Sequence, residues 1–128
     1  MKIKTSTLID LALDYAIAMG EGGTDFHYDT IATYWIKING KDRALAEGWS
    51  QSFTPSADWT QGGSIIEREK ISIQHTGDAS KWYAHVWDIN RENFFPVMYG
   101  PTPLIAAMRC FVASKLGNEV EIPGELLK

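Results

Sequence analysis

The chain has 128 residues, of which 45% are hydrophobic, and it contains five Trp, five Tyr and five Phe. It can therefore bury a core of its own, which excludes intrinsic disorder. The length favours a single domain over residues 1–128. Twelve basic against sixteen acidic side chains give a net charge of −4 without a basic cluster, which disfavours a nucleic-acid partner. Cys110 is the one cysteine, which excludes an internal disulfide bond and fits a reducing cytoplasm.

The N-terminal segment places Lys2 and Lys4 ahead of an apolar stretch, an order superficially similar to that of a signal peptide. Asp10 and Asp14 interrupt the stretch, which a signal peptide would not tolerate. No run approaches the roughly 18 apolar residues that a membrane span needs. We therefore expect a soluble, cytoplasmic protein that does not bind a membrane.

The first predicted elements are a short strand or arm at 1–4 and an amphipathic helix at 8–19. Apolar residues recur in the helix at intervals of three and four: Leu8, Leu11, Ala12, Tyr15, Ala16 and Met19. Thr7 with Asp10 resembles a capping box, and Ser6 is the rival cap. The glycines of GEGG end the helix.

A strand is predicted at 30–38, because TIATYWIKI is rich in β-branched and aromatic residues. Asn39-Gly40 follows directly and is the strongest short signal of a β-hairpin. The second arm would lie near 42–47, where DRALAE has helical preferences. That arm therefore stays open, and residues 48–55 indicate a loop.

A second helix is predicted at 57–69, with Ser56 as its N-cap and Asp58 near its positive end. The pair Gly62-Gly63 weakens it, since each mid-helix glycine costs about 1 kcal/mol relative to alanine. Such a cost is easier to understand where another backbone or a ligand must approach closely. The alternative, a loop through the glycines and a short helix after them, stays open.

A second, antiparallel hairpin is predicted from 71–75 and 81–88, joined by the turn-forming segment TGDAS. Its second arm alternates two sets of side chains, namely Trp82, Ala84 and Val86 against Tyr83, His85 and Trp87. Both sets include bulky residues, which argues against one face lying bare in water.

The last predicted helix, 103–116, has almost no polar face; Thr102 caps it, Pro103 takes its tolerated first position and Gly117 ends it. A helix that is apolar nearly all round is buried nearly all round. One stripe is large (Leu104, Met108, Phe111, Val112) and a second is small (Ala106, Cys110, Ala113, Gly117). We expect the helix to lie on a sheet and its small stripe to touch another helix, in preference to a second subunit.

These elements predict a single α+β domain in which about three helices pack on a small, mainly antiparallel sheet, in the manner of an α/β sandwich.

Two long motifs carry a family resemblance: PSADWTQGGSIIEREKIS at 55–72 and GPTPLIAAMRCFVASKLGNEVEIPGEL at 100–126. Together with MKIKTSTL and LALDYAIA near the N-terminus, they resemble small phage and prophage proteins typified by the X protein of the lambdoid nin region, a family of unestablished molecular function. The resemblance is weakest over 21–54 and 88–99. The order of elements is also similar to the compact α/β sandwich of other small phage proteins. The resemblance implies a temperate-phage or prophage protein in the cytoplasm of a bacterial host, and it carries over no catalytic residues.

Arg109 is an isolated charge near the middle of the apolar helix, and an unpaired buried charge is very costly. The acidic residues Asp58, Glu67 and Glu69 lie on or beside the second helix. We hypothesise that the two helices meet and that Arg109 pairs with one of these carboxylates. The alternatives are a purely structural ion pair and an arginine that reaches solvent past Lys115.

The segment DWTQGG is the second candidate site, because Trp59 and Gln61 beside two glycines could offer a ligand a flat apolar surface, an amide and backbone donors. The alternative is a helix start with Trp59 in the core. No Gly-Lys-Ser/Thr ending follows, so the segment is not a phosphate loop.

No catalytic or metal-binding pattern is present. His27, His75, His85 and Cys110 lack the paired spacing of zinc ligands, and Cys110 is typical of a buried small hydrophobe. We expect no cofactor and no metal.

We therefore expect a non-enzymatic phage or prophage accessory protein that binds a host or phage protein. The alternative is a small-molecule or nucleotide-signal binding protein with a polar pocket between the 57–69 and 103–116 helices. The candidate binding residues are Asp58, Trp59, Gln61, Gly62, Gly63, Glu67, Arg68 and Arg109. The sequence leaves the oligomeric state open, with the small stripe of the last helix as a candidate contact.

Overall fold

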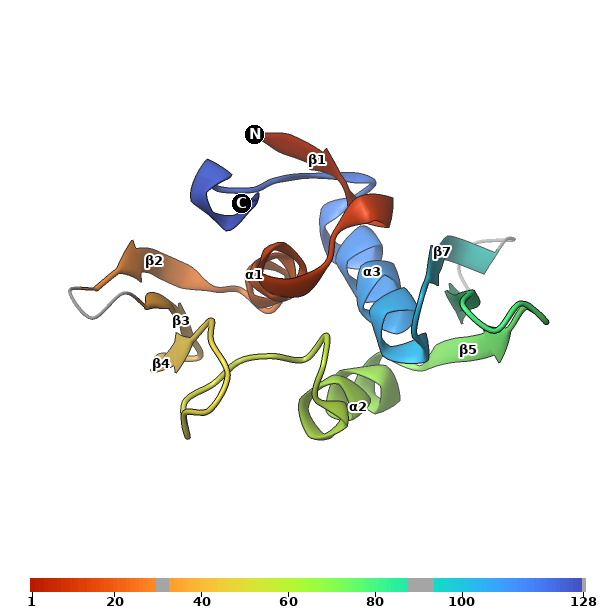
Figure 1. Ribbon diagram of the computed structural model, residues 1–128, viewed down its shortest axis with the longest axis horizontal. Coiled ribbons are helices and arrows are strands. Elements are labelled where there is room, and N and C mark those ends of the chain that lie inside the picture. Colours follow the sequence, from red (N-terminus) through yellow and green to blue (C-terminus); the bar gives the residue numbers. More distant parts are fainter. Residues whose placement is uncertain (30–32, 88–93, 128) are drawn as a thin grey trace.

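The computed structural model describes residues 1–29, 33–87 and 94–127 (Figure 1). Two parts of the predicted elements lie outside the described residues: residues 30–32 of the strand predicted at 30–38, and residue 88 of the second predicted hairpin. The helices of the described part are α1 (Asp10–Gly20), α2 (Trp59–Glu69) and α3 (Pro103–Leu116), with short 3₁₀ turns η1 (Thr5–Thr7) and η2 (Gly124–Leu127).

The described strands form three small antiparallel sheets. The first pairs β1 (Lys2–Lys4) with β8 (Glu119–Glu121); the second has the order β2 (Thr24–Tyr28), β3 (Tyr34–Ile38), β4 (Lys41–Ala44); the third has the order β5 (Ile71–His75), β6 (Trp82–Trp87), β7 (Phe94–Gly100). The predicted α+β class is confirmed, with the strands divided among three sheets.

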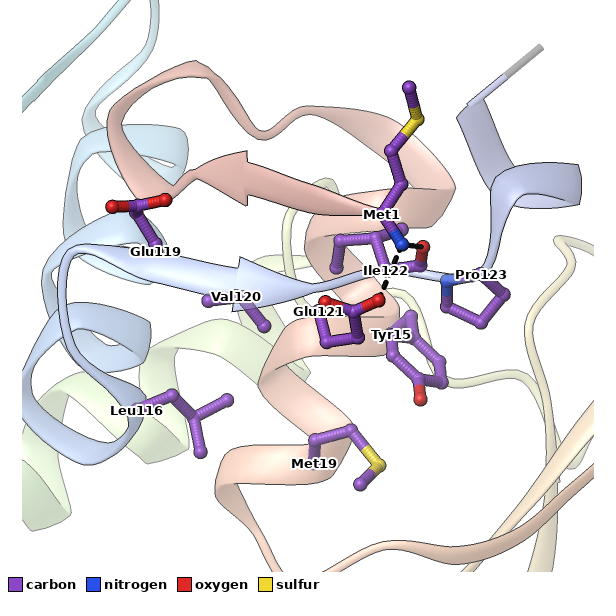
Figure 2. Close-up of a pocket in the computed structure, with 9 residues that line it drawn as sticks. All are labelled: Met1, Tyr15, Met19, Leu116, Glu119, Val120, Glu121, Ile122 and Pro123. Atoms are coloured by element: carbon purple, nitrogen blue, oxygen red, sulfur yellow. Dashed lines mark hydrogen bonds and ion pairs between the residues drawn. The ribbon is translucent and has the colours of Figure 1, made fainter.

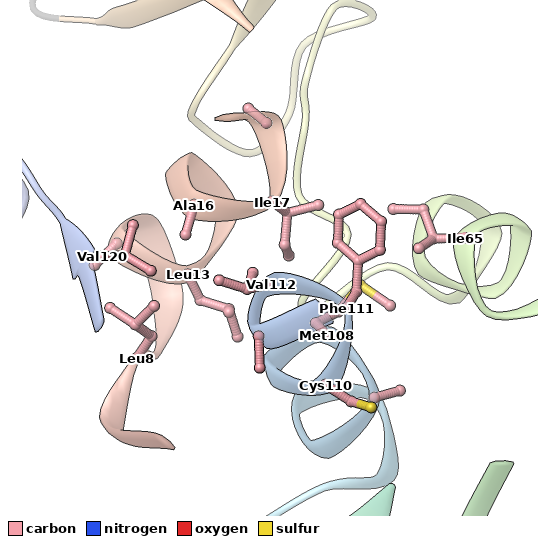
Figure 3. Close-up of a cluster of buried hydrophobic side chains, with 14 of the residues drawn as sticks. Leu8, Leu13, Ala16, Ile17, Ile65, Met108, Cys110, Phe111, Val112 and Val120 are labelled. Carbon is pink, nitrogen blue, oxygen red and sulfur yellow. The ribbon is translucent and has the colours of Figure 1, made fainter. Parts of the chain in front are cut away.

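The helices lie between the two three-stranded sheets (Figure 1). The β2–β4 sheet is at one end of the molecule and the β5–β7 sheet at the other, where α3 packs on all three strands. The β1–β8 ladder brings the two ends of the chain side by side. Side chains of α1, α2 and α3 meet in the core between the sheets (Figure 3).

The predicted bounds and caps of α3 are confirmed: the hydroxyl of Thr102 accepts a bond from the backbone N–H of Ile105 at 3.0 Å, and Gly117 ends the helix with a φ of 93°. The helix lies on a sheet, as predicted, but the prediction that its small stripe touches another helix is wrong. The small stripe faces the sheet, because Cys110 bonds to the carbonyl of Pro96 and Ala106 approaches Gly100 of β7. Only small side chains let the helix lie that close to a strand.

The large stripe of α3 instead contacts the other helices. Leu104 lies against Gly62 of α2, and the Phe111 ring lies against Gly20 at the end of α1. The small stripe, including Ala106, Cys110 and Ala113, is buried within the chain.

The predicted helix at 57–69 is confirmed as α2, which continues through its glycines; the cap is Asp58 and not Ser56. Ser56 bonds instead to the buried carboxyl of Asp14, through its side chain and through its backbone N–H at 2.9 Å. The expected close approach is found at Gly62 alone, where a Cβ would lie 2.5 Å from the Pro55 carbonyl oxygen.

The hairpin at Asn39-Gly40 is confirmed, with φ of 52° and 78° at the two turn residues and Ile38 paired with Lys41. The open second arm is strand β4, so pairing with β3 overrides the helical preference of DRALAE. The second predicted hairpin is likewise confirmed, as β5 and β6.

Helix α1 begins later than predicted, at Asp10, and its N-cap is Ile9, without a side-chain capping bond. The proposed cap Thr7 belongs to η1, where its hydroxyl donates to the Lys4 carbonyl at 2.8 Å. Because its hydroxyl bonds within the 3₁₀ turn, Thr7 does not cap α1.

Candidate functional site

The predicted residues at the start of α2 hold the preceding loop in place. Asp58 accepts from the backbone N–H of Thr60 at 2.9 Å and from Gln61 Nε2 at 3.0 Å, and the Gln61 amide oxygen accepts from the backbone N–H of Thr54 at 3.0 Å. The Gln61 and Thr60 bonds lower the pKa of Asp58. With Arg43, these residues line a polar hollow of about 550 Å³, and their polar groups are largely engaged with one another.

Trp59, the next residue, is 54% exposed, so the interpretation that places it in the core is wrong. Glu67 is also exposed. Gly62 is buried against α3, whereas a Cβ at Gly63 would meet nothing within 4 Å. Neither glycine offers a ligand-sized cradle of its own.

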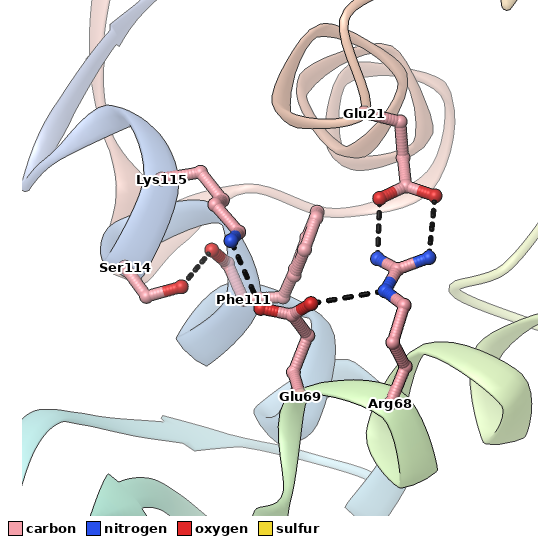
Figure 4. Close-up of polar contacts among 6 residues, drawn as sticks. All are labelled: Glu21, Arg68, Glu69, Phe111, Ser114 and Lys115. Atoms are coloured by element: carbon pink, nitrogen blue, oxygen red, sulfur yellow. Dashed lines mark hydrogen bonds and ion pairs between the residues drawn. The ribbon is translucent and has the colours of Figure 1, made fainter. Parts of the chain in front are cut away.

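Arg68 belongs to an ion-pair cluster at the surface (Figure 4). Its guanidinium bonds to both carboxylate oxygens of Glu21 and, through Nε, to Glu69 at 2.9 Å. Lys115 Nζ lies 3.0 Å from the other oxygen of Glu69. The cluster ties the end of α1 to α2 and α3, and exposed pairs of this kind each contribute about 0–1 kcal/mol.

The predicted pairing of Arg109 with a carboxylate of the α2 segment is wrong, although α2 and α3 do meet. Arg109 Nε donates to the Leu8 carbonyl and Nη1 to the Tyr99 carbonyl, both at 2.8 Å. Arg109 is 8% exposed, and burial lowers the pKa of its guanidinium. It points toward η1 and β7, and Glu69 is already engaged by Arg68 and Lys115.

Apart from the exposed Glu67, the polar members of the predicted set therefore lie in three separate places. Asp58 and Gln61 line the polar hollow, Arg68 lies in the surface cluster, and Arg109 lines another hollow beside β7. They do not gather in one pocket between α2 and α3.

An apolar groove lies between α1 and the β8 segment, where the two ends of the chain meet (Figure 2). Its volume is about 430 Å³. The apolar lining comes from the N-terminus, α1, the end of α3 and the β8 segment: Met1, Tyr15, Met19, Leu116, Val120, Ile122 and Pro123. Glu119 and Glu121 complete the lining, and Glu121 pairs with the amino group of Met1 at 2.6 Å.

A row of aromatic rings extends the groove across the β2–β4 sheet. The Tyr15 ring meets Phe26 edge-on at 5.0 Å between centroids, Phe26 stacks on Tyr34 at 5.6 Å, and Tyr34 lies 4.8 Å from Tyr28. Tyr28 is 56% exposed. Through Tyr15, these ring contacts link the groove to the exposed Tyr28, and we name the groove together with these rings the groove–tyrosine surface.

Sequence reasoning missed this surface, although Tyr15 and Met19 were recognised as part of one helix face. The groove depends on the pairing of Ile3 with Val120, two residues that are remote in the chain. Strand β2, which carries Phe26 and Tyr28, was not predicted. The local sequence therefore gave no signal that these side chains adjoin.

Two buried titratable groups lie outside these hollows. Burial raises the pKa of Asp14 from 3.8 to about 7, against the lowering effect of its bonds with Ser56. Burial also raises the pKa of the Cys110 thiol to about 12, so Cys110 has the character of an inert, buried small side chain, as predicted.

Within the described residues, no group of three or more His, Cys, Asp or Glu side chains is arranged to hold a metal ion. None of the helices in that part combines the length and the hydropathy needed to cross a membrane. The family model for NinX of bacteriophage P22 matches residues 4–115. No curated protein matches the chain.

Proposed function

The chain belongs to the NinX family of bacteriophage P22, a family of phage nin-region proteins, and on this premise we propose that it is a non-enzymatic accessory protein that binds a host or phage protein in the bacterial cytoplasm. The groove–tyrosine surface is the contact that it offers to this partner.

The observation that carries this proposal is the continuity of apolar side chains on the surface. Leu116 and Tyr28 mark its two ends, and they are 37% and 56% exposed. Continuous exposed apolar patches are unusual on monomeric proteins and mark interaction sites. A groove of about 430 Å³ can receive an apolar anchor side chain, and tyrosines beside such a groove are typical of interface centres.

The make-up of the groove favours a protein segment as its occupant. Met19 is unbranched and adapts to differently shaped side chains. The neighbouring rings can lie flat against backbone and apolar groups, and they lose little side-chain entropy on binding. These properties support the proposal that the partner binds here through a segment of its chain.

A crosslinking experiment tests the location. A photoreactive benzophenone side chain is placed at Tyr28 of the full chain, in host cells in which the phage is induced. We expect it to capture one phage or host protein, and the added substitution Leu116→Glu, at the far end of the surface, to abolish that capture.

The matched control is Trp59→Glu, since Trp59 is as exposed as Tyr28 but lies on α2. The control should leave the capture unchanged. Capture that survives Leu116→Glu, or that is lost equally in Trp59→Glu, would contradict docking at this surface.

A further inference from the structure

A third hollow lies beside the end of β7, bounded by the turn between β5 and β6, by η1 and by Arg109 in the middle of α3, and we name it the β7 hollow. Its volume is about 370 Å³, within the range of roughly 300–1,000 Å³ that is typical of small-molecule sites. It is lined by Ser6, Ser80, Lys81, Val97, Met98, Tyr99, Gly100, Pro101 and Arg109.

Arg109 presents a donor to this hollow. Its Nε and Nη1 bond to backbone carbonyls, and Nη2 has no bond within the described residues. Since no buried side-chain nitrogen or oxygen of those residues lacks a partner, Nη2 must be accessible to solvent. Arg109 is one of the residues that line the β7 hollow, which gives Nη2 a route to solvent.

The charge of Arg109 is not neutralised from within the fold. Neither of its two partners is a carboxylate, and all the residues that line the β7 hollow are neutral or basic. The other hollows described above contain Glu47 and Asp58, or Glu119 and Glu121. In a chain of net charge −4, an acid-free hollow around a buried guanidinium is complementary to an anion.

Lys81 supplies a second cation from a different element. Its Nζ lies 4.8 Å from the centre of the Tyr99 ring, at the wall of the hollow. Asp78, the nearest acid of the turn, bonds to the backbone N–H of Ser80 at 3.1 Å and to its hydroxyl at 3.0 Å. This carboxylate therefore organises the turn that carries Lys81, and it is not part of the lining.

We propose that the β7 hollow binds a small phosphate-bearing molecule, with the phosphate held by Arg109 Nη2 and Lys81 Nζ. Two cations match the charge of a phosphate monoester, which is about −2 at neutral pH. The guanidinium fork fits phosphate oxygens, and the exposed hydroxyl of Ser6 adds a neutral donor. The side chains of Val97 and Tyr99 are left to contact the rest of the molecule.

The test is a titration of the full chain in phosphate-free buffer with inorganic phosphate and, separately, with adenosine monophosphate, followed by amide NMR shifts. We expect saturable shifts at Ser80 and Gly100 with either probe, and no such shifts with chloride at equal ionic strength. Tighter binding of the monophosphate would assign part of the affinity to Val97 and Tyr99, and equal binding would assign it to the phosphate alone; both results support the site.

Lys81→Met should weaken binding about tenfold, because one charge-assisted contact is lost. The control is Lys41→Met, at the turn between β3 and β4, which should bind as the unmodified chain does; both lysines are exposed, so neither change is expected to affect folding. The absence of saturable shifts with either probe, or equal weakening in the two variants, would overturn the proposal.

Discussion

The two arginines of the α2–α3 region bond to different kinds of acceptor. Arg68, at the surface, bonds to the carboxylates of Glu21 and Glu69. Arg109, in the interior, bonds to two backbone carbonyls. At the surface, side chains of opposite charge are free to reach each other, and Arg68 pairs with two carboxylates. In the interior, the partners of Arg109 are the backbone acceptors that lie within its reach.

The two arginines differ in how much free energy is lost when their bonds are removed. Without Arg109, the backbone carbonyls of Leu8 and Tyr99 would lose the bonds that it donates, and a buried unmade hydrogen bond costs about 1–3 kcal/mol. The surface carboxylates lose little in water without Arg68. Arg109 therefore fastens the N-terminal segment and β7 to α3, whereas Arg68 adds a minor tie between helices.

The largest expected effect on stability is that of replacing the interior arginine. Arg109→Met keeps most of the side-chain volume but removes the bonds donated to both carbonyls, so the free energy of unfolding should fall by about 2–5 kcal/mol. Arg68→Met should change it by about 1 kcal/mol or less. Urea unfolding of both variants measures the difference, and equal losses would show that the carbonyl bonds are not what makes the interior arginine important.

Asp14 extends the comparison to a buried acid. Because the folded state raises its pKa from 3.8 to about 7, the folded protein holds the proton more tightly than the unfolded chain does. The free energy of unfolding should therefore fall as pH rises from about 4 to about 7, and then level off. Asp14→Asn keeps an acceptor for Ser56 and should be more stable than the unmodified chain at pH 8, by on the order of 4 kcal/mol.

Urea unfolding between pH 4 and pH 8 checks this prediction, with Asp42→Asn in the exposed part of β4 as the control. The two aspartate variants should agree near pH 4 and diverge above it. Parallel pH profiles would mean that Asp14 is not buried as described.

The smallest expected effects concern the two glycines of α2. A Cβ at Gly62 would lie 2.5 Å from both the Pro55 oxygen and Leu104 Cδ1, so Gly62→Ala should destabilise the protein by about 1–3 kcal/mol. Gly63→Ala enters open space and should stabilise it by about 1 kcal/mol through helix propensity. Thermal unfolding compares the pair, and shifts of the same sign in both variants would contradict the close packing of α2 on α3.

Local sequence signals were sufficient for the elements that depend on local chemistry. Thr102 and Gly117 delimit α3, and Asn39-Gly40 forces the turn between β3 and β4, because each residue acts within its own few neighbours. By contrast, DRALAE becomes a strand because β3 offers an edge to it.

Distant contacts account for what could not be predicted. The partners of Arg109 are carbonyls at positions 8 and 99, and any residue type could supply them, so the sequence holds no signal for the choice. The apolar groove forms only after β1 pairs with β8, at opposite ends of the chain.

The most direct test of the central claim is hydrogen exchange at the arginine side chains, measured by NMR on the Nε–H groups of Arg109 and Arg68. The account predicts that the Arg109 Nε–H, bonded to Leu8 in the interior, exchanges far more slowly than the Arg68 Nε–H at the surface. Equal exchange rates would show that the Arg109 guanidinium is not held by buried carbonyls, and would contradict the account.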